Sequence, residues 1–171
     1  IIGDPNPDIS AGLNLDLKWK NLTLSMFFTG EFGFDILNST KRQTQFMSYG
    51  GVSTNRSTDI LNCWSETNRG SSIPAASLTD VNNEMRTSTY FVEDGSYVKM
   101  KYIKLGYALP ESLTKKWCQG MNIYAQVENL FTITGYSGLD PELPLAGYGS
   151  RIDSGVYPTA RTYTLWLIVN F

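Results

Sequence analysis

Strict alternation of apolar and polar residues near the start of the chain constrains the fold more than any other feature of the sequence. Between Ile9 and Trp19 every odd position is apolar, while the even positions are Ser, Gly, Asn, Asp and Lys. A run with period two predicts a β-strand that has one apolar face. Its eleven residues match the length with which a tilted β-strand crosses a hydrocarbon layer, about 9 to 11 residues.

The segment after Lys20 and Asn21 alternates again with the opposite parity. Its apolar residues are Leu22, Leu24, Met26 and Phe28. A two-residue hairpin loop pairs Trp19 with Leu22 and extends the pairing from there. The expected pairs are Trp19 with Leu22, Leu17 with Leu24, Leu15 with Met26 and Leu13 with Phe28. Both strands then show the same apolar face, so the register is self-consistent.

Three further alternating segments, at residues 98–109, 121–131 and 161–171, bring the expected number of strands to five. The parity slips near Tyr102 and Ile103, which predicts a β-bulge. Pro110 ends the first of these segments, because proline has no backbone N–H for the ladder. The ten residues that follow predict a short connection with about one helical turn.

The connections alternate between short and long. Short ones are expected at residues 20–21 and 111–120, and long ones at about 30–95 and 132–160. This alternation is typical of outer-membrane barrels. A soluble β-sandwich or a lipocalin-type barrel has similar strands. The apolar face favours the membrane barrel, since it carries Leu, Met, Trp and Phe rather than the Val and Ile of a close-packed sandwich.

Composition excludes several other classes. A net charge of −2 offers no basic stripe for nucleic acid. No run approaches the roughly 20 apolar residues of a membrane helix. Ten Tyr, eight Phe and four Trp suit interfaces and membrane girdles. The chain does not open on a secretory signal, so we expect either a mature form or a fragment.

Several separated blocks resemble SusC/RagA-like, TonB-linked outer-membrane receptors. Four blocks carry the resemblance: residues 1–38, "EDGSYVKMKYIKLGYALPESL", "NIYAQVENLFTITGYSGLDPEL" and "DSGVYPTARTYTLWLIVNF". Residues 40–89 match least, although "DILNCWSETN" is similar to a loop element of the family. The plug domain and the TonB-contacting N-terminal segment have no counterpart here.

The resemblance implies an all-β fold, the antiparallel transmembrane β-barrel. Receptors of this kind close with about 22 strands, whereas five strands leave two open edges that hydrocarbon does not tolerate. We therefore expect residues 1–171 to be the C-terminal segment of a TonB-dependent barrel: its last five or so strands with two long extracellular loops. If Phe171 ends in the periplasm, both short turns are periplasmic.

The family's function implies import of glycan oligomers or peptides through the outer membrane. The implied partners are a SusD-like surface lipoprotein, the TonB complex through the N-terminal part that is missing here, the barrel-assembly machinery and outer-membrane lipids. Two alternatives from other classes remain open: a passive outer-membrane porin and a soluble carbohydrate-binding β-sandwich. An upstream plug would exclude the porin, and extraction without detergent would indicate the sandwich.

Two sets of residues are candidates for function. Aromatic residues in the long loops are expected to contact substrate or the lipoprotein lid, or else to pack within the loops: Tyr49, Trp64, Tyr136, Tyr148 and Tyr157. Alternating residues of the last strand resemble the signal that the barrel-assembly machinery reads: Tyr163, Leu165, Leu167, Val169 and Phe171. The same alternation suits lipid-facing or girdle residues.

Catalysis has little support in the sequence, and no enzymatic activity, cofactor or metal is expected. The chain has no His, so it offers neither a Ser-His-Asp triad nor a His-ligated metal site. "GEFGF" lacks the Lys and Ser or Thr of a P-loop. Carboxylates such as Asp140 and Glu142 lie in a Gly-rich loop, where they usually stabilise turns. Cys63 and Cys118 fall in connections on opposite sides of the proposed barrel, so we expect no disulfide between them.

Overall fold

The computed structural model describes residues 2–50, 54–80, 82–145 and 151–171. The chain divides into two compact units, each assembled from separate stretches of sequence. The sheet unit comprises Pro7–Phe34, Gly95–Gly135 and Tyr157–Phe171, and the loop unit comprises Ile1–Asn6, Asp35–Asp94 and Tyr136–Val156. In the part of the chain that is described, no helix is long and apolar enough to cross a membrane.

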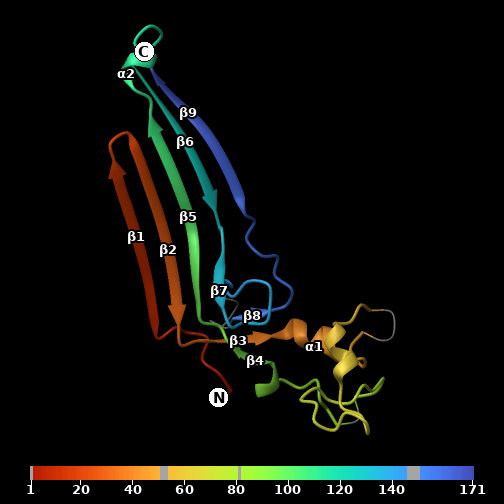
Figure 1. Cartoon of the computed structure of the whole chain (residues 1–171). Helices are drawn as coiled ribbons and strands as arrows, with labels where there is room; N and C mark the ends of the chain where they lie inside the picture. Colours follow the sequence, from red (N-terminus) through yellow and green to blue (C-terminus); the bar gives the residue numbers. More distant parts are fainter. Residues whose placement is uncertain (1, 51–53, 81, 146–150) are drawn as a thin grey trace. The chain divides into compact units, whose positions relative to one another are not determined.

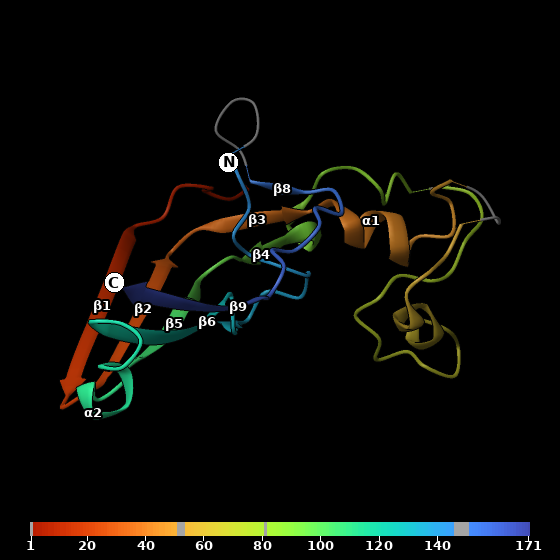
Figure 2. The ribbon, with the colours of Figure 1, turned by 90° about the horizontal axis from the view of Figure 1, so that it is seen from above.

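The sheet unit is an antiparallel sheet. Its strands are β1 (Ile9–Trp19), β2 (Leu22–Phe32), β5 (Tyr97–Ala108), β6 (Gly120–Glu128), β7 (Thr132–Thr134) and β9 (Thr162–Asn170), with the short helix α2 (Glu111–Thr114) between β5 and β6. The five long strands follow the order β1-β2-β5-β6-β9, and β7 pairs with β5 (Figure 1). Seen from above, they form a single curved layer (Figure 2). A soluble sandwich would need two stacked sheets.

The first hairpin has the predicted register. Trp19 pairs with Leu22, and the ladder continues without interruption to Ile9 opposite Phe32. All four predicted pairs occur in it. The loop of two residues contains Lys20 with a positive φ of 52°. Apolar residues occupy odd positions before this loop and even positions after it, and this change determines the register. A slip by one residue would move all apolar side chains of one strand to the polar face of the sheet.

The predicted β-bulge is present in β5, at Lys101. Phe27 of β2 pairs with Tyr102, but Phe28 pairs with Met100. Lys101 is therefore the inserted residue, one position before the predicted slip. The extra residue restores the apolar parity of β5 on the other side of the bulge.

The strand β6 is shorter than the sequence predicts. We expected this strand to continue to Phe131, but it ends at Glu128. Asn129 then adopts a positive φ of 52°, and its backbone amide donates to the carbonyl of Lys101. The chain resumes as β7, which pairs with the opposite half of β5.

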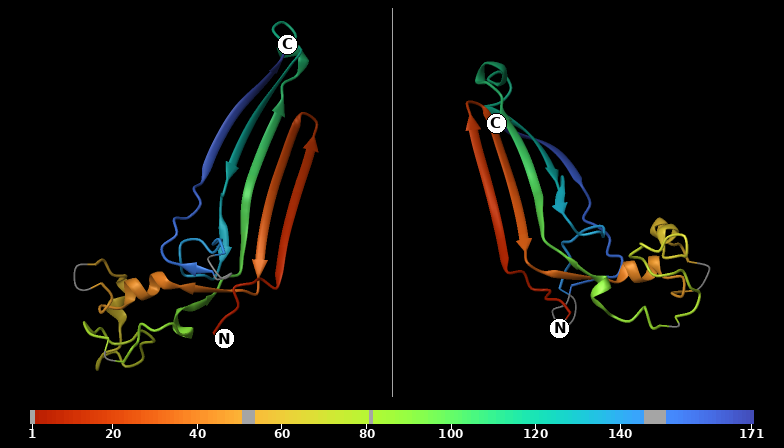
Figure 3. Two further views of the ribbon diagram at one scale, coloured as in Figure 1. Left: turned by 180° about the vertical axis from the view of Figure 1, so that it is seen from behind. Right: turned by 60° about the horizontal axis from the view of Figure 1, so that its bottom comes forward.

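Both short connections lie at one end of the sheet, together with the end of β9. Leu22 pairs with Tyr107, and the amide of Ala108 donates to the carbonyl of Asn21 at 2.8 Å. Gly120 pairs with Asn170. The hairpin turn and α2 can be followed at this end in both views of Figure 3. The long connections leave from the other end, as the alternation of connection lengths predicted.

The two faces of the sheet differ in polarity. One face carries cross-strand rows of apolar residues, of which the central one is Leu17, Leu24, Leu105, Ala125 and Leu165. Three leucines of this row, Leu17, Leu105 and Leu165, are 59%, 45% and 75% exposed. The other face is polar, with a row of Asp16, Ser25, Lys104, Gln126 and Thr164. An apolar surface of this extent marks a membrane or protein interaction.

Aromatic pairs interrupt the polar face. Tyr124 stacks on Trp166 with ring centroids 5.2 Å apart and an angle of 14° between the planes. The neighbouring residue on β5 is Gly106, which pairs with Tyr124. A Cβ atom at Gly106 would approach the Tyr124 ring to 2.7 Å, so glycine is needed here for the ring to cover the backbone.

The loop unit was not predicted to contain regular structure. It has strands β3 (Asp35–Asn38), β4 (Val92–Asp94) and β8 (Ile152–Asp153), helix α1 (Ser39–Gln45) and 3₁₀ turns η1 (Thr58–Asn62) and η2 (Thr89–Phe91). The strand order is β4-β3-β8. Its core holds Ile36 and Phe91, both without exposed surface. The rings of Phe46, Tyr90 and Phe91 pack against one another with centroids 5.1 to 5.9 Å apart.

Candidate functional site

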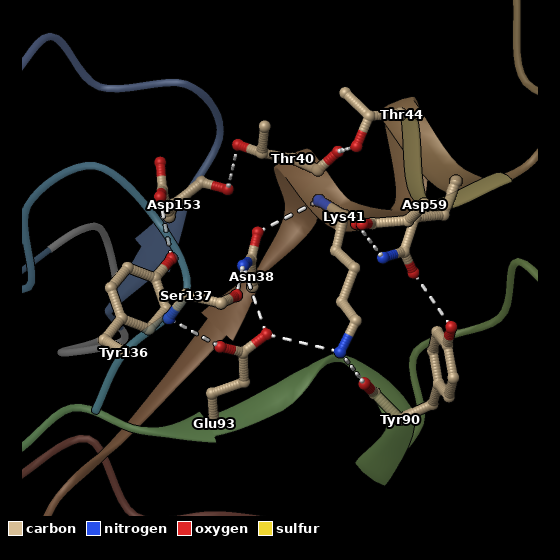
Figure 4. A network of polar contacts seen from close by, with 11 residues as sticks. Asn38, Thr40, Lys41, Thr44, Asp59, Tyr90, Glu93, Tyr136, Ser137 and Asp153 are labelled. Atoms are coloured by element: carbon tan, nitrogen blue, oxygen red, sulfur yellow. Dashed lines mark hydrogen bonds and ion pairs between the residues drawn. The ribbon is translucent and has the colours of Figure 1, made fainter. Parts of the chain in front are cut away.

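A polar network in the loop unit joins the two long connections (Figure 4). Asn38, the last residue of β3, is 4% exposed. Its Oδ1 accepts from the backbone amide of Lys41 at 3.0 Å, which caps the N-terminus of α1. Its Nδ2 donates to Glu93 Oε1 and to Ser137 Oγ, both at 3.2 Å. One side chain thus connects β3, α1, β4 and the second long connection.

Glu93 is the anionic centre of this network. Lys41 Nζ lies 3.4 Å from Glu93 Oε1, and the amide of Ser137 donates to Oε2 at 3.0 Å. Burial acts to raise the pKa of Glu93, but the hydrogen bonds from Ser137 and the charge of Lys41 outweigh it, so that the pKa is lowered from the usual value. Glu93 is consequently held ionised.

Asp153 and Tyr136 form a second buried pair in the same unit. The Tyr136 hydroxyl donates to Asp153 Oδ2 at 2.7 Å, while the amides of Gly155 and Val156 donate to Oδ1. Burial, and then the carboxylate beside it, raise the pKa of Tyr136. The phenol therefore serves as a fixed hydrogen-bond donor that holds the strand β8 to the start of the second connection.

A polar cavity of about 240 Å³ opens beside this network. It is lined by Asn38, Thr40, Lys41, Thr44, Gln45, Ser57, Asp59, Ser137, Gly138, Leu139, Asp153 and Gly155. Hydrogen bonds from Ser57 and Gln45 lower the pKa of Asp59, so its carboxylate is an ionised acceptor. Hydroxyl, amide, ammonium and carboxylate groups in one small cavity suit a ligand rich in hydroxyl or amide groups.

The predicted contact residues are distributed over both units. Tyr49 and Trp64 belong to the loop unit and are partly exposed, and Tyr157 belongs to the sheet unit and is 88% exposed. Tyr136 is only 6% exposed. Its hydroxyl donates to Asp153, so Tyr136 packs within its loop, which is the second of the two roles expected for these aromatics. Tyr148 lies outside the described residues.

Of the candidates within the described residues, Tyr49, Trp64, Tyr136 and Tyr157 do not line the cavity, and the residues that do were not predicted. The signal available in the sequence was Asn38 ahead of Ser39–Gln45, since Asn is a preferred N-cap. The partners of Asn38 lie 55 and 99 residues away, a separation that spacing alone does not reveal.

Four residues of the predicted assembly signal share one face of β9, and Phe171 follows the end of the strand at Asn170. Of the five residues, Tyr163, Leu165, Leu167 and Phe171 are exposed, and Val169 is half-buried. Tyr163, Leu165, Leu167 and Val169 pair with Val127, Ala125, Ile123 and Met121 of β6, so they extend the open apolar face. This placement suits contact with lipid or with another protein.

The carboxylates considered for catalysis stabilise loop backbone. Asp140 Oδ1 accepts from the amide of Glu142 at 3.0 Å, as expected for a turn residue. Asp153 is fully engaged with Tyr136 and two amides.

Curated relatives match the whole chain. TonB-dependent receptor P3 of Formosa agariphila is 37% identical over 179 residues, covering 100% of this chain. TonB-dependent receptor SusC of Bacteroides thetaiotaomicron is 26% identical over 169 residues, covering 98%. The chain spans only 17% and 15% of the length of these two proteins. No protein-family model matches the chain.

Solved structures of a related importer share the fold of this chain. The RagAB peptide importer in its open-open state superposes with a TM-score of 0.80 at 28% identity, covering 97% of this chain and 17% of that one. Its closed-closed state gives a TM-score of 0.78. The antiparallel sheet is therefore of the barrel type found in that importer.

Proposed function

We propose that this chain, which belongs to the SusC/RagA-like, TonB-linked receptors, is a segment of an outer-membrane importer for glycan oligomers or peptides. The observation that carries the proposal is the open apolar face of the sheet unit, together with similarity to these receptors over the whole chain. A sheet with one apolar and one polar face can separate lipid from a hydrated lumen. The chain would then be a multi-pass part of the barrel, residues 1–171 forming one segment of it.

The arrangement of connections supports an orientation. Short turns on the periplasmic side and long loops outside are the rule for such barrels. We therefore place the turn at Lys20 and the connection at Lys116 in the periplasm. The loop unit lies outside, where its polar cavity meets the substrate or the lid.

The composition of the cavity supports a substrate with many hydroxyl or amide groups, a description that fits both glycans and peptides. RagAB is named as a peptide importer, and that name is the reason to keep peptides beside glycans. The partly exposed Tyr49 and Trp64 in the loop unit are proposed to contact substrate or a SusD-like lipoprotein, because aromatic residues are enriched at interfaces.

Two further partners belong to the proposal. The alternating residues Tyr163 to Val169 of β9, with Phe171 after its end, would be read by the barrel-assembly machinery before they face lipid. Energy would come from the TonB complex through a part of the receptor that the present chain does not include.

Filling the cavity tests the link between the loop unit and uptake. In the full-length receptor, Thr44→Trp places an indole into the cavity of about 240 Å³ and should reduce uptake of the cognate oligomer. Leu78→Trp is the matched control, since Leu78 is 60% exposed and does not line the cavity. Equal uptake by both variants, at equal amounts of receptor on the cell surface, would show that the cavity does not take part in transport.

Energy dependence separates import from passive diffusion. Uptake by the wild-type receptor should stop when TonB is deleted or when a protonophore collapses the proton gradient. Uptake that persists unchanged under both conditions would indicate a passive porin and contradict the proposed importer.

A further inference from the structure

The short-turn end of the sheet unit carries exposed aromatic side chains. Trp19 is 70% exposed and Trp117 is 83% exposed. Trp19 ends β1 on the apolar face, in the same cross-strand row as Leu22 and Tyr107. Trp117 follows α2 in the neighbouring connection. Large amphipathic rings at one end of an apolar face belong at the boundary between hydrocarbon and headgroups.

Lysines accompany these rings. Lys20 lies in the hairpin turn, with Nζ 5.2 Å from the centroid of the Trp19 ring. Lys115 and Lys116 immediately precede Trp117 and are exposed. Glu111 is the acidic side chain that lines the same groove as Lys115 and Lys116. The side chains of this end therefore carry an excess of positive charge beside apolar surface.

Two grooves hold these groups. One of about 330 Å³ is formed by Trp19, Lys20, Asn21, Leu22 and Tyr107. The other, of about 580 Å³, is formed by Glu111, Lys115, Lys116, Trp117, Cys118, Gln119 and Phe171. The amide of Ala108, the last residue of β5, donates to the carbonyl of Asn21 in the first groove, and the connection that forms the second groove begins three residues later.

We propose that this basic rim (Trp19, Lys20, Lys115, Lys116 and Trp117) binds the phosphate groups of anionic phospholipids in the adjoining leaflet. Lysine is suited to this role, because its aliphatic stem lies along apolar surface while the ammonium reaches the headgroup level. The acyl chains of the same lipid would lie against the apolar rows that start at Trp19. The inference rests on the proposed membrane location of the sheet.

A lipid explains this combination better than a soluble anion does. A free phosphate would be held by the lysines alone and would leave both tryptophans exposed to water. A phospholipid carries its phosphate in the headgroup and its hydrocarbon in the acyl chains next to it. The rim presents its cations at the end of the sheet, and the apolar side chains follow along the sheet, so the two parts of the lipid match the two surfaces. A basic residue near a charged membrane surface attracts anionic lipid, about fivefold for each Lys or Arg.

The test uses the purified full-length receptor in nanodiscs that contain spin-labelled phosphatidylglycerol or spin-labelled phosphatidylcholine. The wild-type receptor should retain phosphatidylglycerol at its boundary in preference to phosphatidylcholine by about fivefold or more, the effect of at least one lysine. The triple variant Lys20→Gln, Lys115→Gln, Lys116→Gln should lose this preference. High salt should weaken the wild-type preference, because it screens exposed charges.

Lys104→Gln is the control, since Lys104 pairs with Ser25 and Gln126 on the polar face. This substitution removes the same charge at a position away from the rim. Its lipid preference should equal that of the wild type. Equal retention of the two lipids by the wild type, or an unchanged preference in the triple variant, would overturn the inference while leaving import intact. A receptor that fails to enter nanodiscs would overturn the proposed function as well.

Discussion

The two units of this chain are stabilised in different ways. The sheet unit depends on backbone ladders between neighbouring strands, and it leaves one apolar face open. The loop unit has strands of only two to four residues and depends instead on an aromatic core and a buried polar network. The sheet unit thus leaves apolar surface that suits lipid, whereas the loop unit buries its own aromatic residues. Substitutions in the two units should have different consequences.

A charge on the apolar face should have the largest effect. Leu15→Arg or Leu167→Arg in the full-length receptor places a cation against lipid, at a cost of roughly 2 to 4 kcal/mol near the bilayer midplane. Barrel yield and heat-modifiable migration in gels measure this loss. Asn14→Arg is the control, because Asn14 lies on the polar face beside Asp16. If Asn14→Arg were the more damaging change, the assignment of the two faces would be inverted.

Removal of the Asn38 side chain should destabilise the loop unit without affecting the barrel. Asn38→Ala leaves partners of a buried side chain unsatisfied, at a cost of about 1 to 3 kcal/mol. Hydrogen exchange should increase in β3, α1 and β4 while barrel yield stays unchanged. Asn62→Ala is the matched control, as Asn62 is exposed. Loss of barrel yield with Asn38→Ala would show that the two units do not fold separately.

Sequence reasoning succeeded in the sheet and failed in the loop unit for the same physical reason. Strand register follows from parity on either side of a turn, which is local information; Trp19 opposite Leu22 needed only the dipeptide between them. The loop unit depends on pairs such as Asn38 with Ser137, 99 residues apart. The burial of Tyr136 likewise depends on Asp153, and nothing in the spacing of a Gly-rich loop indicates which aromatic residue turns inward.

Within the sheet, Gly106 allows a smaller test. Gly106→Ala brings a Cβ atom within 2.5 Å of Thr23 Oγ1 and 2.7 Å of the Tyr124 ring. The hydroxyl can rotate away, but the ring must move, and displacing the stack on Trp166 costs about 0.5 to 1.5 kcal/mol. Urea unfolding of the receptor in vesicles measures the change. Gly120→Ala is the control, because its nearest neighbour, Asn170 Nδ2, is 3.7 Å away. Equal stability of the two variants would mean that the ring does not need glycine beneath it.

Acid should weaken the loop unit. The pKa of Glu93 is lowered from its usual value of 4.5, so the native state binds this proton less readily than the unfolded state does. The stabilisation is therefore fully present above pH 4.5 and is lost as the pH falls through the lower, folded pKa. Exchange of α1 and β4 should accelerate in that range, by a small amount because burial opposes the shift. Glu93→Gln should reduce the pH dependence, and the lowered pKa of Asp59 in the same unit should leave a part of it. An unchanged pH dependence in this variant would show that Glu93 is not its source.

A reducing agent should not change the stability of the receptor, because we expect no disulfide between its two cysteines in this chain. Cys63 and Cys118 are both free thiols in the structure, and they belong to different units. In the proposed topology Cys63 lies in an outer loop and Cys118 in a periplasmic connection, so an apolar band about 25 Å tall separates them. A disulfide requires Cα atoms within about 7 Å of each other. Non-reducing peptide mapping of the purified receptor should find both thiols unlinked. A peptide that joins Cys63 to Cys118 would contradict the two-sided orientation itself, because no barrel can bring the two ends of its strands within reach of one bond.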